Sequence, residues 1–173
     1  MTARPSITRV VRSSDVPMTD PDGVATGAVV LRLAGSRYAL PLAAVVEVGR
    51  VPPITRVPGL PGWLVGVTNW RGRLLAVVDL GPLLGGPKTA VAGTTRLLLV
   101  SQAAATLGVL ADSVDGVGPV TGEPEPAVGT LRADAAMLVH GQRTDADGPI
   151  GVLDVQAVLA LRRRLPGNRE RNC

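Results

Sequence analysis

Short apolar runs separated by turn residues dominate the chain after residue 26. Val29–Leu33 and Tyr38–Leu40 are rich in Val and Leu and flank Ala34–Arg37, a turn-forming segment, which predicts two strands. The pattern restarts later, with strands expected at Arg96–Val100 and Leu107–Leu110. Because the runs are short and closely spaced, we expect a mainly β protein with only short helices.

The clearest single element is Gly66–Asp79, in which two apolar runs flank a polar turn. Val, Leu and Ala suit a half-buried pleated surface, so this segment predicts a β-hairpin. Asn69 and Gly72 tolerate the positive φ that tight turns require. The turn Asn69–Gly72 is therefore expected to carry Arg71 to the surface.

The residue types in the connections around this hairpin also predict their local structure. Asp79 ends an apolar strand, and its carboxylate is expected to act as the N-cap of a short helical turn over Leu80–Leu84. Pro41–Val48 predicts another short helical turn. Closely spaced prolines keep Val51–Val57 extended, and Pro58–Gly62 predicts a turn.

The predicted elements recur in the same order in the two halves of the chain, and in both halves an Asp follows the last strand. The matched pieces are residues 29–33 with 97–100, 38–42 with 107–110, 45–48 with 113–116, and 77–84 with 152–159. Each match is short, so chance similarity among Val- and Leu-rich strands is the alternative. A true repeat predicts two similar small β-barrels.

Composition indicates what the core is made of and in which compartment the protein is expected. The 173 residues are 46% hydrophobic and include no Phe, so the core is expected to consist of Val, Leu, Ile and Ala. The single cysteine is Cys173, which excludes a disulfide within the chain and is typical of a reducing compartment. The sequence shows no export signal or membrane-spanning run, so we expect a cytoplasmic protein.

The formal charge of +4 belongs to the end of the chain. The residues responsible are Arg162, Arg163, Arg164, Arg169 and Arg171, opposed by Glu170. We therefore expect three regions: a flexible arm at residues 1–26, a folded domain at 27–161 and a basic tail at 162–173. The tail is either a solvated terminus or an electrostatic contact with a partner.

Enzymatic sites have little support in the sequence. His140 is the only histidine, is expected in a loop, and lacks partners at metal-ligand spacing. Lys88 is the only lysine, and no phosphate-binding loop is present. Asp79 and Asp154 occupy matching places in the repeat, which favours two helix caps over a catalytic carboxylate pair. We expect no catalysis, no metal and no cofactor.

With these motifs in place, the sequence resembles the CheW family of chemotaxis coupling proteins over about residues 27–161. The most specific motif is Gly66–Gly72, which is followed by Val77–Leu80. Tyr38–Glu47 and Val109–Val117 extend the resemblance. It implies a fold of two intertwined five-stranded SH3-like β-barrels. It also implies a non-catalytic adaptor that couples chemoreceptor tips to the regulatory domain of a CheA-type histidine kinase.

The resemblance further implies which residues contact the receptor. An apolar groove flanked by one acid and one arginine suits a helical receptor tip. The candidate receptor-contact residues are Leu42, Val45, Glu47, Gly66, Asn69, Trp70, Arg71 and Gly72. Three of them have simpler interpretations, since Arg71 fits an ordinary turn, Glu47 a solvated position and Val45 a plain core position.

The candidate kinase-contact residues are Val51, Ile54 and Val57, for which core burial is an equal alternative. Trp70 stands where the family usually has an aliphatic residue, so the receptor surface is expected to be bulkier here. The turn Asn69–Gly72 has no match in the second half of the repeat, so we expect the functional residues to lie in this turn.

Two other functions remain open. One is an adaptor of the same kind in a kinase pathway with a non-flagellar output, such as twitching. The other is a small nucleic-acid-binding barrel. The second requires stacking aromatics beside basic residues, and only Tyr38, Trp63 and Trp70 are available on a body with no net charge. We therefore expect no nucleic-acid partner and no direct membrane insertion.

Overall fold

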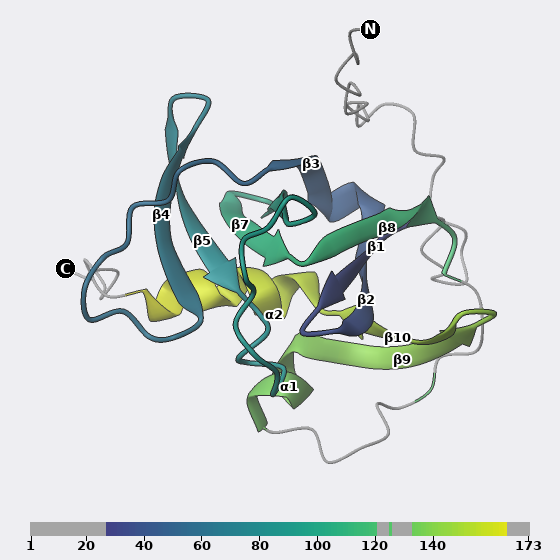
Figure 1. Cartoon of the computed structure of the whole chain (residues 1–173). Coiled ribbons are helices and arrows are strands. Elements are labelled where there is room, and N and C mark those ends of the chain that lie inside the picture. The colour runs from purple at the N-terminus through teal and green to yellow at the C-terminus, as the bar shows by residue number, and fades with distance from the viewer. Residues whose placement is uncertain (1–26, 121–124, 126–132, 166–173) are drawn as a thin grey trace, which may run out of the picture.

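The computed structural model describes residues 27–120, 125 and 133–165 (Figure 1). The predicted arm at 1–26 and the tail after residue 165 lie outside the described residues. The described chain forms ten strands in two five-stranded sheets, as expected for a mainly β protein. No helix within these ranges is long and apolar enough to cross a membrane.

Each sheet contains strands from both halves of the chain. The first has the order β8-β1-β2-β10-β9, and its strands are β1 (Ala28–Leu33), β2 (Ser36–Pro41), β8 (Ser113–Gly118), β9 (Val139–Asp145) and β10 (Gly148–Leu153). The second has the order β3-β6-β7-β5-β4, and its strands are β3 (Val45–Arg50), β4 (Leu64–Trp70), β5 (Arg73–Asp79), β6 (Arg96–Gln102) and β7 (Ala105–Ala111). The helices are α1 (Ala133–Leu138) and α2 (Val155–Ala160), with 3-10 turns at Leu42–Ala44 and Leu161–Arg164.

The topology confirms the internal repeat. Each strand of the first half has a counterpart five strands later, from β1 with β6 to β5 with β10. When every strand is replaced by its counterpart, the order of one sheet becomes the order of the other, so the two halves are intertwined. The two parallel strand pairs have the same register as the predicted matches. Gly108 lies beside Val77 in the pair β7–β5, and its match Ala39 lies beside Val152, the match of Val77, in the pair β2–β10. The predicted matches of 38–42 with 107–110 and of 77–84 with 152–159 are therefore correct.

Two predicted matches are displaced. Residues 29–33 correspond to 98–102 rather than to 97–100, because Leu31 lies beside Tyr38 and Val100 beside Leu107. Residues 45–48 are shifted by one residue against 113–116. A bulge leaves Val46 unpaired where β3 meets β6, and an equivalent bulge leaves Asp115 unpaired where β8 meets β1. Val46 therefore corresponds to Asp115, and Glu47 corresponds to Gly116. The bulge stands at the same place in both halves, so it does not cause the shift; the short apolar runs fit either alignment, and only the strand register distinguishes them.

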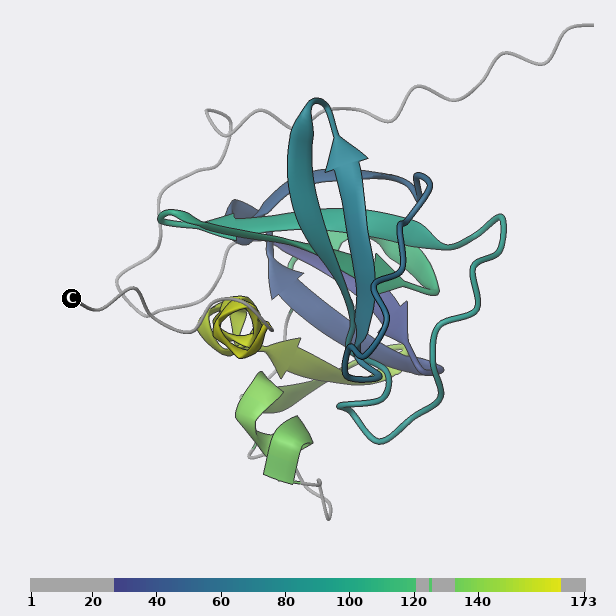
Figure 2. The ribbon, with the colours of Figure 1, turned by 90° about the vertical axis from the view of Figure 1, so that its left-hand side faces the viewer.

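The core lies between the two sheets and against α2, the yellow helix seen end-on in Figure 2. The run Leu97–Val100 in β6 contributes to two apolar clusters, one on each face of the second sheet. Leu98 and Val100 join the large central cluster, whereas Leu97 joins a smaller cluster on the other face of the second sheet. Both faces of β6 are therefore covered, which is why its sequence is continuously apolar.

The two repeated aspartates both accept bonds from backbone amides, but in different ways. Asp154 caps α2, with the Ala157 N–H donating to its Oδ1 at 3.0 Å, as expected. Asp79 is buried and precedes the turn at residues 81–85, where the Leu84 N–H donates to the Leu80 carbonyl at 2.9 Å, so the expected short helical turn forms but does not extend into a helix. The Gly81 N–H donates to its Oδ1 at 3.0 Å and the Thr89 N–H to its Oδ2 at 2.6 Å, so Asp79 fastens the following loop to β5.

Candidate functional site

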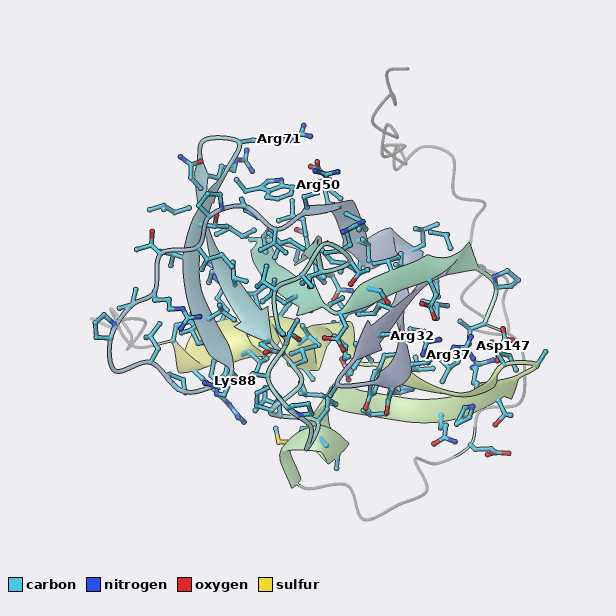
Figure 3. All side chains as sticks on the ribbon, viewed as in Figure 1. Arg32, Arg37, Arg50, Arg71, Lys88 and Asp147 are labelled. Atoms are coloured by element: carbon cyan, nitrogen blue, oxygen red, sulfur yellow. The ribbon has the colours of Figure 1, made fainter. Side chains whose placement is uncertain are left out.

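The hairpin of β4 and β5 ends in a two-residue turn, Arg71–Gly72, with φ of +50° and +81°. Two successive positive φ values are typical of the tight turns that follow strand twist. The sequence predicted positive φ at Asn69 and Gly72, but the structure has it at Arg71 and Gly72. Asn69 lies in β4, and its side-chain Oδ1 accepts from the Gly72 N–H at 2.8 Å. The turn does carry Arg71 outward, as Figure 3 shows.

Glu47 in β3 holds this hairpin tip. Its Oε1 accepts from Arg71 Nη2 at 2.6 Å, and its Oε2 accepts from the Trp70 Nε1–H at 3.3 Å. The Glu47 side chain is 20% exposed and that of Arg71 is 71% exposed. β3 and β4 are opposite edges of the second sheet, so these two bonds join its edges. We call Glu47, Trp70 and Arg71 the tip cluster.

Trp70 points inward along the tip rather than forming an exposed bulge. Its ring lies over Gly49, where an added Cβ would be 2.8 Å from Cη2. It also packs against the smaller apolar cluster that includes Leu75 and Leu97. The expectation of a bulkier surface at Trp70 is therefore correct only in part, because much of the ring fills space at the edge of the sheet.

The segment after β3 brings the sheet edges together a second time. Thr55 and Val67 exchange two backbone hydrogen bonds, at 2.8 and 3.0 Å. Gly66, next to Val67, has a φ of +152°, and an added Cβ would be 2.2 Å from the Thr55 carbonyl oxygen. Gly66 therefore shapes the hairpin by permitting this close approach, and it lies away from the tip.

The remaining predicted receptor residues do not join the tip cluster. Leu42 lies in the 3-10 turn between β2 and β3 and Val45 begins β3, and both pack, partly buried, against the central core. Among the predicted kinase residues, Val51 and Ile54 pack against the smaller cluster, while Val57 is 42% exposed. The structure thus separates each predicted set into core-facing and surface members.

The turn at the tip has a positional counterpart in the second half, contrary to expectation. Trp70 pairs with Arg73 around its two-residue turn, and Asp145 pairs with Gly148 around an equivalent turn between β9 and β10. The position is duplicated and only the residues differ. Sequence comparison missed it because no side chain is shared between the two turns.

Charged residues form an ion-pair cluster beside that second turn. Its members Arg32, Arg37 and Asp147 are labelled in Figure 3. Arg37 makes a bidentate pair with Asp145, with distances of 2.7 and 2.9 Å. These hydrogen bonds are the main cause that lowers the pKa of Asp145 below its usual value and raises the pKa of Arg37. Next to Arg37, burial raises the pKa of Tyr38.

Sequence reasoning also missed an exposed apolar pair, Val46 and Leu74, which line a groove beside the tip cluster. A signal was present, because successive strand residues face opposite sides and Leu74 and Leu75 cannot both face one cluster. His140 is an exposed residue of β9, not of a loop. Within the described ranges, no three His, Cys, Asp or Glu residues gather as metal ligands would.

Comparison with known proteins follows the same part of the chain. The model of the CheW-like domain matches residues 27–163. Chemotaxis protein CheW of Bacillus subtilis is 26% identical over 76% of this chain and 85% of its own length. Protein FrzA of Myxococcus xanthus is 30% identical over 77% of this chain and 84% of its own.

Two further matches complete the comparison. Protein PilI of Pseudomonas aeruginosa is 35% identical, but over only 50% of this chain and 48% of PilI. The crystal structure of the scaffolding protein TtCheW from Thermoanaerobacter tengcongensis superposes with a TM-score of 0.65 at 29% identity, covering 75% of this chain and 88% of TtCheW. The two intertwined sheets are therefore an arrangement that a solved relative shares.

Proposed function

Because the chain belongs to the family of the CheW-like domain, we propose that it is a non-catalytic adaptor that couples chemoreceptors to a CheA-type histidine kinase. The similarity to a chemotaxis protein and to a scaffolding protein over most of their lengths supports this function. The adaptor works in the cytoplasm, where it reaches the membrane-bound receptor arrays through its partners.

The tip cluster is the observation that best supports a receptor site. Glu47 fixes Arg71 at one end of an exposed hairpin, so the guanidinium is presented in one orientation while most of it stays accessible. An oriented arginine can donate two parallel bonds to a carboxylate or amide of a partner helix. Residues Leu42, Val45, Gly66, Asn69 and Gly72 support the shape of this region.

The kinase contact belongs on the segment after β3. Val57 is the exposed one of the three candidate residues, and Val51 and Ile54 anchor the segment to the smaller apolar cluster. A partner built on a similar fold would cover Val57 and leave its anchors in place.

The output of the coupled kinase has a second candidate. Relatives named PilI and FrzA stand beside those named CheW, so a kinase pathway other than flagellar motility fits the similarity as well. The adaptor role is the same in both cases, and only the receptor and the kinase differ.

A pull-down with receptor-bearing membranes tests the receptor site. Arg71→Ala is expected to reduce capture of the protein severalfold without loss of fold, because an exposed ion pair contributes only about 0 to 1 kcal/mol to stability. Arg50→Ala, an exposed arginine at the end of β3, is the matched control and should be captured like the wild type. Equal capture of the two variants, with circular dichroism unchanged, would show that Arg71 is not part of the receptor contact.

A further inference from the structure

The repeat places the same four positions at one end of each sheet. In the first sheet these positions hold Arg32, Arg37, Asp115 and Asp145, and they are linked by charge. Arg32 contacts Asp115 at 3.2 Å, and Arg37 makes its bidentate pair with Asp145. Charged side chains joined by ion pairs therefore occupy this end of the first sheet.

In the second sheet the corresponding positions hold Ser101, Thr106, Val46 and Trp70, as the strand registers show. The two hydroxyls bond to each other at 2.9 Å, and Ser101 also donates to the Ala105 carbonyl. Small, mutually satisfied side chains therefore replace a charged cluster, and a hollow of about 450 Å³ lies over them.

Two of the residues that line this hollow are large apolar side chains that remain exposed. Leu74 is 83% exposed and Val46 is 51% exposed, and both line it together with Trp70. Apolar side chains gathered at a hollow differ from apolar residues scattered singly, and they mark a surface on which a partner can bury area.

The hollow continues into a second one of about 700 Å³ between the β6–β7 turn and α2, since Ala104 and Arg162 line both. Arg162 is held at the junction, where its Nη1 donates to the Ala104 carbonyl at 3.2 Å. Alanines make up much of the second lining and permit close approach of another backbone. We call the two hollows together the long groove.

The charge of the long groove has one sign. Arg73, Arg162 and Arg163 line it, and none of the described residues in its lining is acidic. Exposed apolar side chains flanked by arginines are complementary to a helix with an apolar stripe and acidic flanks.

We propose that the long groove binds an acidic amphipathic helix of a partner protein, with Leu74 and Val46 against its apolar stripe and Arg162 paired with its acidic side. The chain's own residues 166–173 are a poor occupant, because they carry two arginines against one glutamate and no large apolar residue. The groove adjoins the tip cluster through Trp70 but does not depend on the coupling function proposed above.

Binding of a synthetic peptide to the full chain tests this proposal. The probe is a helix of about 18 residues with leucines on one face and glutamates on both flanks, labelled for fluorescence anisotropy. A second peptide carries lysines in place of the glutamates. We expect the acidic peptide to bind and the basic peptide to bind at least about tenfold more weakly.

Variants assign the binding to the groove. Leu74→Asp is expected to weaken the acidic peptide about tenfold, and Arg162→Glu should weaken it while improving binding of the basic peptide. Both side chains are exposed, so the fold is retained, as circular dichroism would confirm. Val91→Asp, at an apolar residue that is 63% exposed and outside the groove, is the matched control and should leave the affinity unchanged.

Two outcomes would overturn the proposal. One is equal binding of the acidic and basic peptides by the wild type, because the arginines would then play no part. The other is an acidic peptide whose affinity responds to Val91→Asp as much as to Leu74→Asp, or to neither variant, because the binding would then lie elsewhere.

Discussion

At the scale of single residues, two glycines of one hairpin differ in why they are needed. Gly72 adopts a positive φ in open space, where an added Cβ would meet nothing within 4 Å. Gly66 adopts a positive φ and also lies against the Thr55 carbonyl oxygen. The first position needs only conformational freedom, whereas the second also needs the absence of a side chain.

This difference predicts unequal losses of stability. Gly72→Ala should lower the free energy of unfolding by about 1 kcal/mol, the usual cost of placing alanine in that region. Gly66→Ala should lower it by more than about 2 kcal/mol, because the Thr55–Val67 bridge must also shift. Urea unfolding of the two variants gives both values. Equal losses would mean that the approach of Thr55 does not constrain Gly66.

The two repeated aspartates provide a second prediction. Asp79→Ala leaves the amides of Gly81 and Thr89 without their acceptor in a buried site, so we expect a loss of about 3 kcal/mol. Asp154→Ala removes a single helix cap and should cost about 1 kcal/mol. Thermal unfolding distinguishes them, and a larger loss for Asp154→Ala would contradict the structural role assigned to Asp79.

The aspartates also show how far the sequence can lead. An acid after an apolar strand predicted a backbone acceptor at both places, which is correct. The sequence did not predict Thr89 as the partner of Asp79, because that contact spans a loop without apolar period. Likewise, the tip cluster joins Glu47 to Arg71 across opposite edges of a sheet, and only the three-dimensional topology brings them together.

At the scale of elements, the two equivalent turns have opposite chemistry. The β4–β5 turn carries Arg71, which is held by Glu47, whereas Asp145, the last residue of β9 before the β9–β10 turn, is held by Arg37. The sequence predicted most strands, because their apolar runs are local. It did not predict the bulges or the Arg37–Asp145 pair, since residues 108 positions apart leave no local pattern.

The Arg37–Asp145 pair predicts a specific dependence on pH. The pKa of Asp145 is lowered in the folded protein, so its stabilising effect is present above the ordinary value of 3.8 and is lost as pH falls through the lower folded value. Asp145→Asn should therefore lower the melting temperature at neutral pH and reduce the part of the acid-induced loss that lies below pH 3.8.

Asp147→Asn is the control for this prediction, because that carboxylate is 84% exposed and 3.9 Å from Arg37. It should follow the wild type across the pH range. A melting temperature of Asp145→Asn that falls with acid as steeply as that of the wild type would count against the pair.

At the scale of the whole molecule, the exchange of strands between the halves makes the two sheets dependent on each other. Neither half contains all the strands of a sheet, and the central cluster draws residues from both sheets. The internal repeat in the sequence predicted two related units. It did not show that their strands are exchanged, because a match between two sequence segments carries no information on which strands are hydrogen-bonded to each other.

This exchange predicts a single cooperative unfolding transition. Trp63 and Trp70, the only tryptophans, lie just before and within β4, so tryptophan fluorescence reports on the second sheet, while far-ultraviolet circular dichroism reports on both. The two signals should give coincident urea transitions. Separate midpoints would mean that one sheet persists without the other.

The most direct test of the adaptor account is reconstitution of the three components. A chemoreceptor in membranes and a CheA-type kinase, both encoded by the same genome as this chain, are mixed with and without the purified protein, and the kinase that sediments with the membranes is measured. The account predicts that the kinase sediments in proportion to the added protein until the receptors are saturated. Sedimentation of the kinase that is the same with and without the protein would contradict it.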